Sequence, residues 1–186
     1  MYHRWFEFKK SKYVIDYPLC SIENICVFIV YKINEHWKVE EVVEANYLFH
    51  SGARGVCISN KKKLRIHGVD NKNNYLDFGN WGDLKSPVSQ GVWIVIAVWW
   101  NGTGSSLWIN GGIDRRGKEV LVFEGNKAGG SCKTVIANST EGNPGDALNG
   151  CIKNIEIYNK NISKDFMEAR MKYLTLQYGI EDSVYK

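Results

Sequence analysis

Short runs of alternating or continuous apolar residues recur along the chain, separated by clusters of Gly, Asn, Asp and Ser. Runs of this length, rich in Val, Ile, Phe, Tyr and Trp, are typical of β-strands joined by turns. Their number and spacing favour an antiparallel sandwich of two sheets. The predicted strands are Trp5–Phe8, Lys12–Asp16, Asn24–Ile33, Tyr47–His50, Gly55–Ser59, Lys63–Gly68, Tyr75–Phe78, Val92–Trp100, Ser106–Asn110, Glu119–Phe123, Thr134–Ala137 and Gly150–Tyr158.

Two of these strands differ in how their polar residues are distributed. Val92–Trp100 is apolar on both faces, which predicts a central strand that is covered on each side. The segment Lys63–His67 instead alternates strictly, so its two apolar residues should face the core. Its basic residues Lys63, Arg65 and His67 should share the solvent face, which is therefore cationic.

One segment near the C-terminus has helical periodicity. Ser163 can cap the first turn, Asp165 suits the positive helix start, and Gly179 supplies a left-handed end. The sequence therefore predicts a helix over about residues 163–178. We expect it to close an edge or an end of the sandwich with apolar side chains at helical spacing: Phe166, Met171, Leu174 and Tyr178.

Length and charge narrow the range of functions. The 186 residues suit one domain, and we predict a single domain over residues 1–186. The formal net charge of +4 is small, so nucleic acid is not the expected partner. No apolar run reaches the roughly 20 residues that a membrane-spanning helix needs. Because the chain opens almost directly on a predicted strand, we expect it to be one module of a larger protein.

The cysteines leave the compartment open. Their odd number, five, means that at least one thiol is free, and none has the spacing of a zinc site. Two disulfides and one buried thiol would suit a secreted domain, whereas five buried thiols would suit a cytosolic one. The residues concerned are Cys20, Cys26, Cys57, Cys132 and Cys151.

Five segments occur in an order that resembles a known superfamily. They are Asn24–Lys32, Trp93–Trp99, Ser106–Gly111, Asn149–Tyr158 and Tyr173–Ile180. Together they resemble the laminin G-like and pentraxin-like branch of the concanavalin A-like lectins and glucanases. The resemblance implies an all-β fold of two curved antiparallel sheets in jelly-roll order, with one C-terminal helix.

The same resemblance implies a recognition or adhesion module. Such domains bind sugars, glycosaminoglycans or proteins through loops along one rim, often with calcium. The expected partner is therefore a glycan, a sulfated polysaccharide or a protein receptor. Calcium binding is left open, because the loop oxygens that could converge on an ion form no calcium motif: Asn80, Asp83, Asn110, Asp114 and Asp146.

A cationic row is the first candidate binding site. Lys61, Lys63, Arg65 and His67 alternate along one strand, so they would present positive charge along a line to a sulfated glycan. The alternative is the ordinary solvated face of a half-buried strand.

A loop tryptophan is the second candidate. Gly79 and Gly82 bracket Trp81, so the backbone can turn sharply and expose its ring for stacking on a sugar. Asn80 and Asp83 would hydrogen-bond to the hydroxyl groups. We expect Trp93 and Trp99 to fill the core, although Trp81 could itself fold over the core edge.

The sequence does not favour catalysis. The glucanase branch of the superfamily is marked by a Glu-x-Asp-x-x-Glu strand, and this chain has none. The acidic cluster of Glu40, Glu41 and Glu44 is typical of a solvated segment. We therefore predict a non-enzymatic module at an extracellular or particle surface, with an intracellular location left open. The alternatives are a receptor-binding or structural head of a virus or phage particle, which would form an oligomer, and a cryptic glycoside hydrolase.

Overall fold

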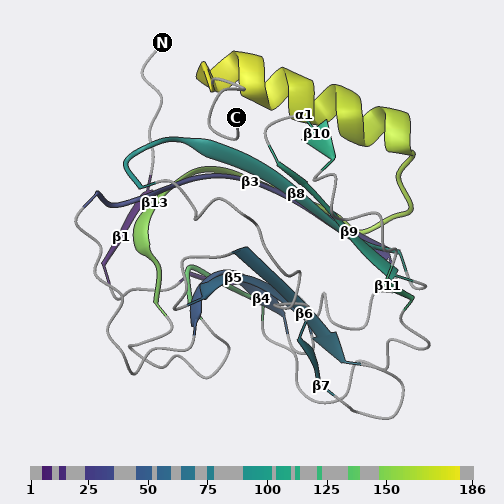
Figure 1. Ribbon diagram of the computed structural model, residues 1–186, viewed down its shortest axis with the longest axis horizontal. Helices are drawn as coiled ribbons and strands as arrows, with labels where there is room; N and C mark the ends of the chain where they lie inside the picture. The colour runs from purple at the N-terminus through teal and green to yellow at the C-terminus, as the bar shows by residue number, and fades with distance from the viewer. Residues whose placement is uncertain are drawn as a thin grey trace.

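The structure is a computed structural model, and it describes residues 6–9, 13–15, 24–35, 45–51, 54–59, 64–69, 75–77, 90–101, 104–109, 112–113, 121–122, 134–138 and 147–180. These residues form two antiparallel sheets, and one helix lies across the outer side of one sheet (Figure 1). The predicted all-β sandwich with a C-terminal helix is confirmed. No helix in the described ranges has the length and hydropathy that crossing a membrane requires.

The described strands divide between sheet A and sheet B. Sheet A has the order β1 (Phe6–Lys9), β13 (Asn149–Tyr158), β3 (Asn24–Ile33), β8 (Ile94–Asn101), β9 (Gly104–Ile109) and β10 (Gly112–Ile113), with β11 (Leu121–Val122) also paired to β9. Sheet B has the order β2 (Tyr13–Ile15), β12 (Thr134–Ile136), β4 (Ala45–Ser51), β5 (Arg54–Ser59), β6 (Leu64–Val69) and β7 (Tyr75–Asp77). Each predicted strand is confirmed to within two residues at either end. The two-residue strand β10 was not predicted, because it is too short to carry a pattern.

The central strands β3 and β8 are buried on both faces, as the apolar pattern of Val92–Trp100 predicts. An inner cluster lies between the sheets and takes alternate residues of these strands: Ile25, Val27, Ile29, Tyr31, Ile33, Ile94, Ile96, Val98 and Trp100. An outer cluster lies on the other face of sheet A and takes the residues between them: Cys26, Phe28, Val30, Val95 and Ala97. Strict alternation thus makes sheet A the middle layer of the molecule.

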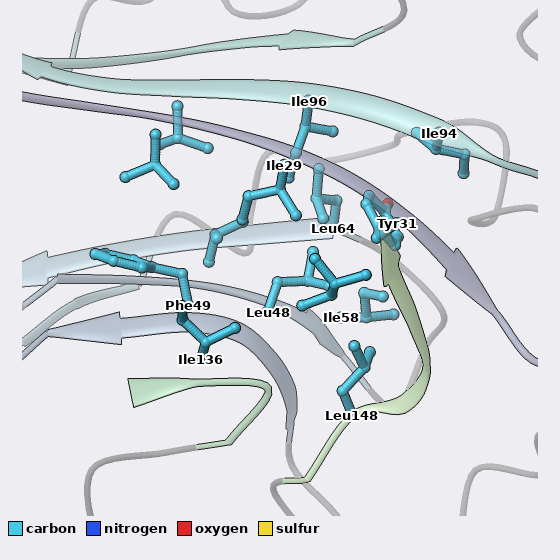
Figure 2. Close-up of a cluster of buried hydrophobic side chains, with 14 of the residues drawn as sticks. Ile29, Tyr31, Leu48, Phe49, Ile58, Leu64, Ile94, Ile96, Ile136 and Leu148 are labelled. Atoms are coloured by element: carbon cyan, nitrogen blue, oxygen red, sulfur yellow. The ribbon is translucent and has the colours of Figure 1, made fainter. Parts of the chain in front are cut away.

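Side chains from both sheets meet in the inner cluster (Figure 2). Ile29 and Ile96 of sheet A face Leu48 and Phe49 of sheet B. The ring of Phe49 lies 6.1 Å from that of the fully buried Trp100.

The tryptophans in and next to β8 lie on both faces of sheet A. Trp93 and Trp99 are half-buried and pack against the outer cluster, while Trp100 fills the space between the sheets. Trp93 and Trp99 thus contribute to the outer cluster as half-buried residues, and the fully buried tryptophan between the sheets is Trp100. The reason is the period of the strand: because Ile94, Ile96 and Val98 face inward, the odd-numbered residues must face the helix.

The helix α1 (Lys164–Tyr178) begins and ends where the sequence predicts. The backbone N–H of Phe166 donates to Oγ of Ser163 over 3.1 Å, which caps the first turn. Gly179 has φ 60° and ψ 39°, a left-handed conformation that glycine adopts without steric cost.

The position of α1 corrects a prediction. The helix covers the outer face of sheet A instead of closing an edge or an end of the sandwich (Figure 1). Its buried residues are Met167, Met171 and Leu174. Phe166 is 40% exposed, and its ring centroid lies 5.3 Å from that of Tyr158. A sheet that is apolar on both faces needs a second cover, and the helix supplies it.

Gly150 allows β13 to lie close to β3. A Cβ atom at this position would collide with the backbone carbonyl oxygen of Lys32. Any larger residue would therefore push the two strands apart, which explains a glycine within a buried strand.

The docking of α1 predicts a sharp contrast between two leucines. Leu174→Ala should lower the free energy of unfolding by about 2–5 kcal/mol, because it opens a cavity in the outer cluster. Leu176→Ala should change it by no more than about 0.5 kcal/mol, because Leu176 is 72% exposed. Chemical denaturation of both variants measures the difference, and equal losses would contradict the proposed docking face.

Candidate ligand-binding surface

The outer face of sheet B carries a pair of aromatic rings. The register between β4 and β5 shifts between Tyr47 and Phe49, so Leu48 and Phe49 both enter the inner cluster. This bulge leaves Tyr47 and His50 on the same outer side, although a regular strand would place them on opposite faces. Their ring centroids lie 4.6 Å apart, and both side chains are half-buried. The bulge therefore builds a small aromatic surface.

Two of the predicted cationic residues lie in the same register rows as these rings. Arg65 pairs with Cys57, which pairs on its other side with Tyr47. His67 pairs with Gly55, which pairs on its other side with His50.

Pairing across antiparallel strands places residues on the same face of a sheet. The strand order of sheet B thus places the backbone positions of Arg65 and His67 in the same rows as an aromatic pair that the sequence did not reveal, with β5 between them. The alternation predicted for this strand agrees with Leu64, which is buried in the inner cluster.

The remaining candidate residues lie outside the described part of the chain: Lys61, Lys63, Asn80, Trp81 and Asp83 of the binding site, and Asn110, Asp114 and Asp146 of the calcium hypothesis. Among the residues that the structure does describe, no group of three or more His, Cys, Asp and Glu could hold a metal ion. The tryptophan loop therefore remains a prediction, and calcium binding stays open.

A second polar cluster links α1 to β13. The guanidinium group of Arg170 donates to both carboxylate oxygens of Glu156, from Nε over 2.7 Å and from Nη2 over 2.5 Å. Asn154 donates to Oε1 over 2.8 Å, and the Tyr158 hydroxyl donates to Oε2 over 3.1 Å. Every oxygen of this carboxylate is thus occupied by two donors.

The surroundings of Glu156 fix its charge. Burial alone would raise the pKa of Glu156, but the hydrogen bonds from Arg170 and Asn154 outweigh it and hold the pKa below its ordinary value. The same contact raises the pKa of Arg170. A general acid needs a raised pKa and a free oxygen, and Glu156 has neither. We conclude that this cluster fastens the helix to the sheet.

Cys26 lies next to this cluster, on the helix side of β3. It is a free, fully buried thiol, which confirms that at least one cysteine is unpaired. Burial and the charge of Glu156 raise its pKa far above the ordinary value. A thiol held neutral in this way is a poor nucleophile and serves as a small apolar side chain.

Comparison with known proteins gives the fold. No protein-family model matches the chain, and no curated protein matches it. Solved structures do resemble it. A CBM40 module of the Ruminococcus gnavus IT-sialidase, bound to α2,3 sialyllactose, is 14% identical with a TM-score of 0.62, over 90% of this chain and 95% of that one.

Two longer proteins contain a similar unit. The NanB sialidase of Streptococcus pneumoniae is 16% identical with a TM-score of 0.60, over 88% of this chain but 27% of that one. The receptor-binding domain of a botulinum neurotoxin mosaic serotype C/D is 17% identical with a TM-score of 0.57, over 89% and 40%. The chain thus spans about a quarter of the sialidase. At these identities the similarity establishes a lectin-like β-sandwich fold.

The Glu156 cluster predicts a loss of stability that depends on pH. Glu156→Gln should lower the free energy of unfolding by about 1–3 kcal/mol at pH 7, because the charge-assisted hydrogen bonds are lost. Because the pKa of Glu156 is lower in the folded than in the unfolded protein, its charge stabilises the fold fully at pH values above the unfolded pKa of about 4.3. This stabilisation is lost as the pH falls through the folded-state pKa. The difference from the parent protein should therefore shrink below about pH 4.

Glu168→Gln is the matched control for this measurement. Glu168 forms an exposed ion pair with Lys164 at 3.5 Å, which should contribute less than about 0.5 kcal/mol. Denaturation at several pH values compares the two variants. A loss for Glu156→Gln that is as small as the control, or that stays constant down to pH 3, would rule out the role given to Glu156.

Proposed function

We propose that this chain is a non-catalytic glycan-binding module. The observation that carries the proposal is the match, over nearly the full length of both chains, to a carbohydrate-binding module that holds a sialyl oligosaccharide. The sandwich is a scaffold on which loops and exposed sheet faces present a ligand site. The outer face of sheet B is the part of the described structure that best suits a sugar.

The chemistry of that face supports the proposal. A sugar ring has apolar C–H groups that stack on aromatic rings, and Tyr47 and His50 offer two rings in contact, tilted by 32°. The register positions of Arg65 and His67 lie in the same rows, one strand beyond β5, and their charges would complement a carboxylate or sulfate group of a ligand that spans these strands. We infer that Lys61 and Lys63 extend this basic row.

The loop Asn80–Asp83 would complete the site at the rim. We propose that the Trp81 ring stacks on a sugar while Asn80 and Asp83 bind its hydroxyl groups. The finer assignment to the laminin G-like or pentraxin-like branch, a role in cell adhesion and an extracellular or particle-surface location are further proposals. They rest on the order of strands in the sequence.

A protein receptor is the second candidate partner. The similarity to the receptor-binding domain of a botulinum neurotoxin favours it, because that unit also serves recognition. We do not propose hydrolysis: the chain covers about a quarter of the NanB sialidase and lacks the Glu-x-Asp-x-x-Glu strand.

A broad glycan array tests the proposal directly. The protein should bind a restricted set of glycans, with acidic glycans preferred over their neutral parents because of the basic face. Repeating the array with calcium and with a chelator tests the calcium prediction separately. Absence of binding to any glycan under both conditions would refute the proposed function and leave the protein-receptor alternative.

Substitutions on the proposed face should separate binding from stability. Trp81→Ala should abolish binding of an array-positive glycan, and Tyr47→Ala should weaken it about tenfold, since stacking on one ring contributes roughly 1–1.5 kcal/mol. Trp81→Ala should lower the free energy of unfolding by much less than the roughly 3–5 kcal/mol of a buried aromatic truncation. Calorimetric titration and denaturation provide both readouts.

Tyr173→Ala is the control, because Tyr173 is 51% exposed on α1, on the opposite side of the sandwich. It should leave glycan affinity unchanged. If Trp81→Ala strongly destabilises the fold while its folded fraction binds normally, Trp81 belongs to the core and the site lies elsewhere.

A further inference from the structure

A second group of basic and aromatic side chains lies on the outer face of sheet A. The Nζ atom of Lys153 lies 4.6 Å from the centroid of the Trp93 ring, and that of Lys32 lies 5.3 Å from it. Lys153 is also 5.3 Å from the ring centroid of Tyr178, at the end of α1. All four side chains are half-buried and so remain accessible to a ligand. We call this group the Trp93 cluster.

A bulge in β13 creates the cluster. Ile152 pairs with Tyr31 and Asn154 pairs with Val30, so Lys153 is an extra residue between two consecutive pairs. Ile152 faces the inner cluster, and the bulge turns Lys153 to the helix side of the sheet. Two lysines from different strands thereby converge on one ring.

Among the residues that the structure describes, no carboxylate forms an ion pair with Lys32 or Lys153. Within the described residues, the ion pairs are Lys164–Glu168 and Arg170–Glu156. The nearby carboxylate of Glu156 is therefore already occupied by Arg170. The two ammonium groups carry like charges and lie within 5.3 Å of the same ring centroid, so an oxyanion that contacted both would be attracted by both charges.

We propose that the Trp93 cluster is an oxyanion-binding site that accepts the sulfate or carboxylate group of an acidic glycan. Lys32 and Lys153 would bind the oxyanion, and the rings of Trp93 and Tyr178 would pack against the apolar part of the sugar. The site is separate from Tyr47 and His50, because it lies on the outer face of the other sheet. That the ligand is a glycan rests on the proposed function; that the site binds an oxyanion does not.

A purely structural role is the competing explanation. A lysine over an aromatic ring stabilises a fold modestly, and the C-terminal end of a helix attracts cations. The last turn of α1 contains no basic residue of its own, so lysines from the sheet could fulfil this role. Affinity and stability must therefore both be measured.

The test compares two double variants that remove the same charge. One is Lys32→Gln with Lys153→Gln, and the control is Lys164→Gln with Lys172→Gln on the exposed side of α1. The probes are a heparin-derived hexasaccharide, α2,3-sialyllactose and, as the neutral comparison, lactose. The first variant should bind the acidic probes about tenfold more weakly than the parent protein, whereas the control should change less than twofold. If the first double variant does not fold, each single substitution is measured instead.

Each outcome decides the proposal. If the parent protein binds an acidic probe and both double variants bind it equally well, the Trp93 cluster is structural and the proposed function stands. If the parent protein binds no glycan, the proposed function fails, and titration with inorganic sulfate then tests the site alone. During this titration the Trp93 indole NMR signal should shift in the parent protein but not in the double variant that carries Lys32→Gln and Lys153→Gln. Absence of a shift in the parent protein would overturn the site.

Discussion

The double burial of β3 and β8 is the constraint on which the rest of the structure depends. Because both strands are apolar on both faces, sheet A cannot be stable with one side in water. Sheet B covers one side and α1 covers the other, which gives three layers. The ion pair between Arg170 and Glu156 then fixes the helix against β13. The helix is thus an integral layer of the core, although it is the last element that the sequence predicts and follows all of the strands.

Two bulges change which side chains this framework presents on its outer faces. In β4, the register shift after Tyr47 places both Leu48 and Phe49 in the inner cluster. The rings of Tyr47 and His50 remain on the outer face. In β13, the extra residue is Lys153, which is turned toward aromatic rings beside α1. Both bulges interrupt the strict alternation of the strands where polar and aromatic groups meet, as expected when a scaffold must present side chains that are not needed for packing.

Much of the fold could be predicted because its signals are local. The β-branched and aromatic runs mark the strands, and Ser163 and Gly179 mark the ends of the helix. The face that α1 covers could not be predicted, because helical periodicity identifies a buried stripe but not the surface that buries it. The candidate sites depend on register. Arg65 and His67 are candidates because their strand alternates, whereas the rings in the same rows come from β4, where a bulge hides the pattern.

The cooperativity of the three layers is tested most directly by native-state hydrogen exchange. If α1 is a layer of the core, the slowest amides of β3, β8 and the middle of α1 should exchange through one opening, with the same free energy and the same dependence on denaturant. A helix whose central amides exchange through a separate opening of much lower free energy, while β3 and β8 remain protected, would contradict the account. It would mean that sheet A is stable without a cover on its apolar outer face.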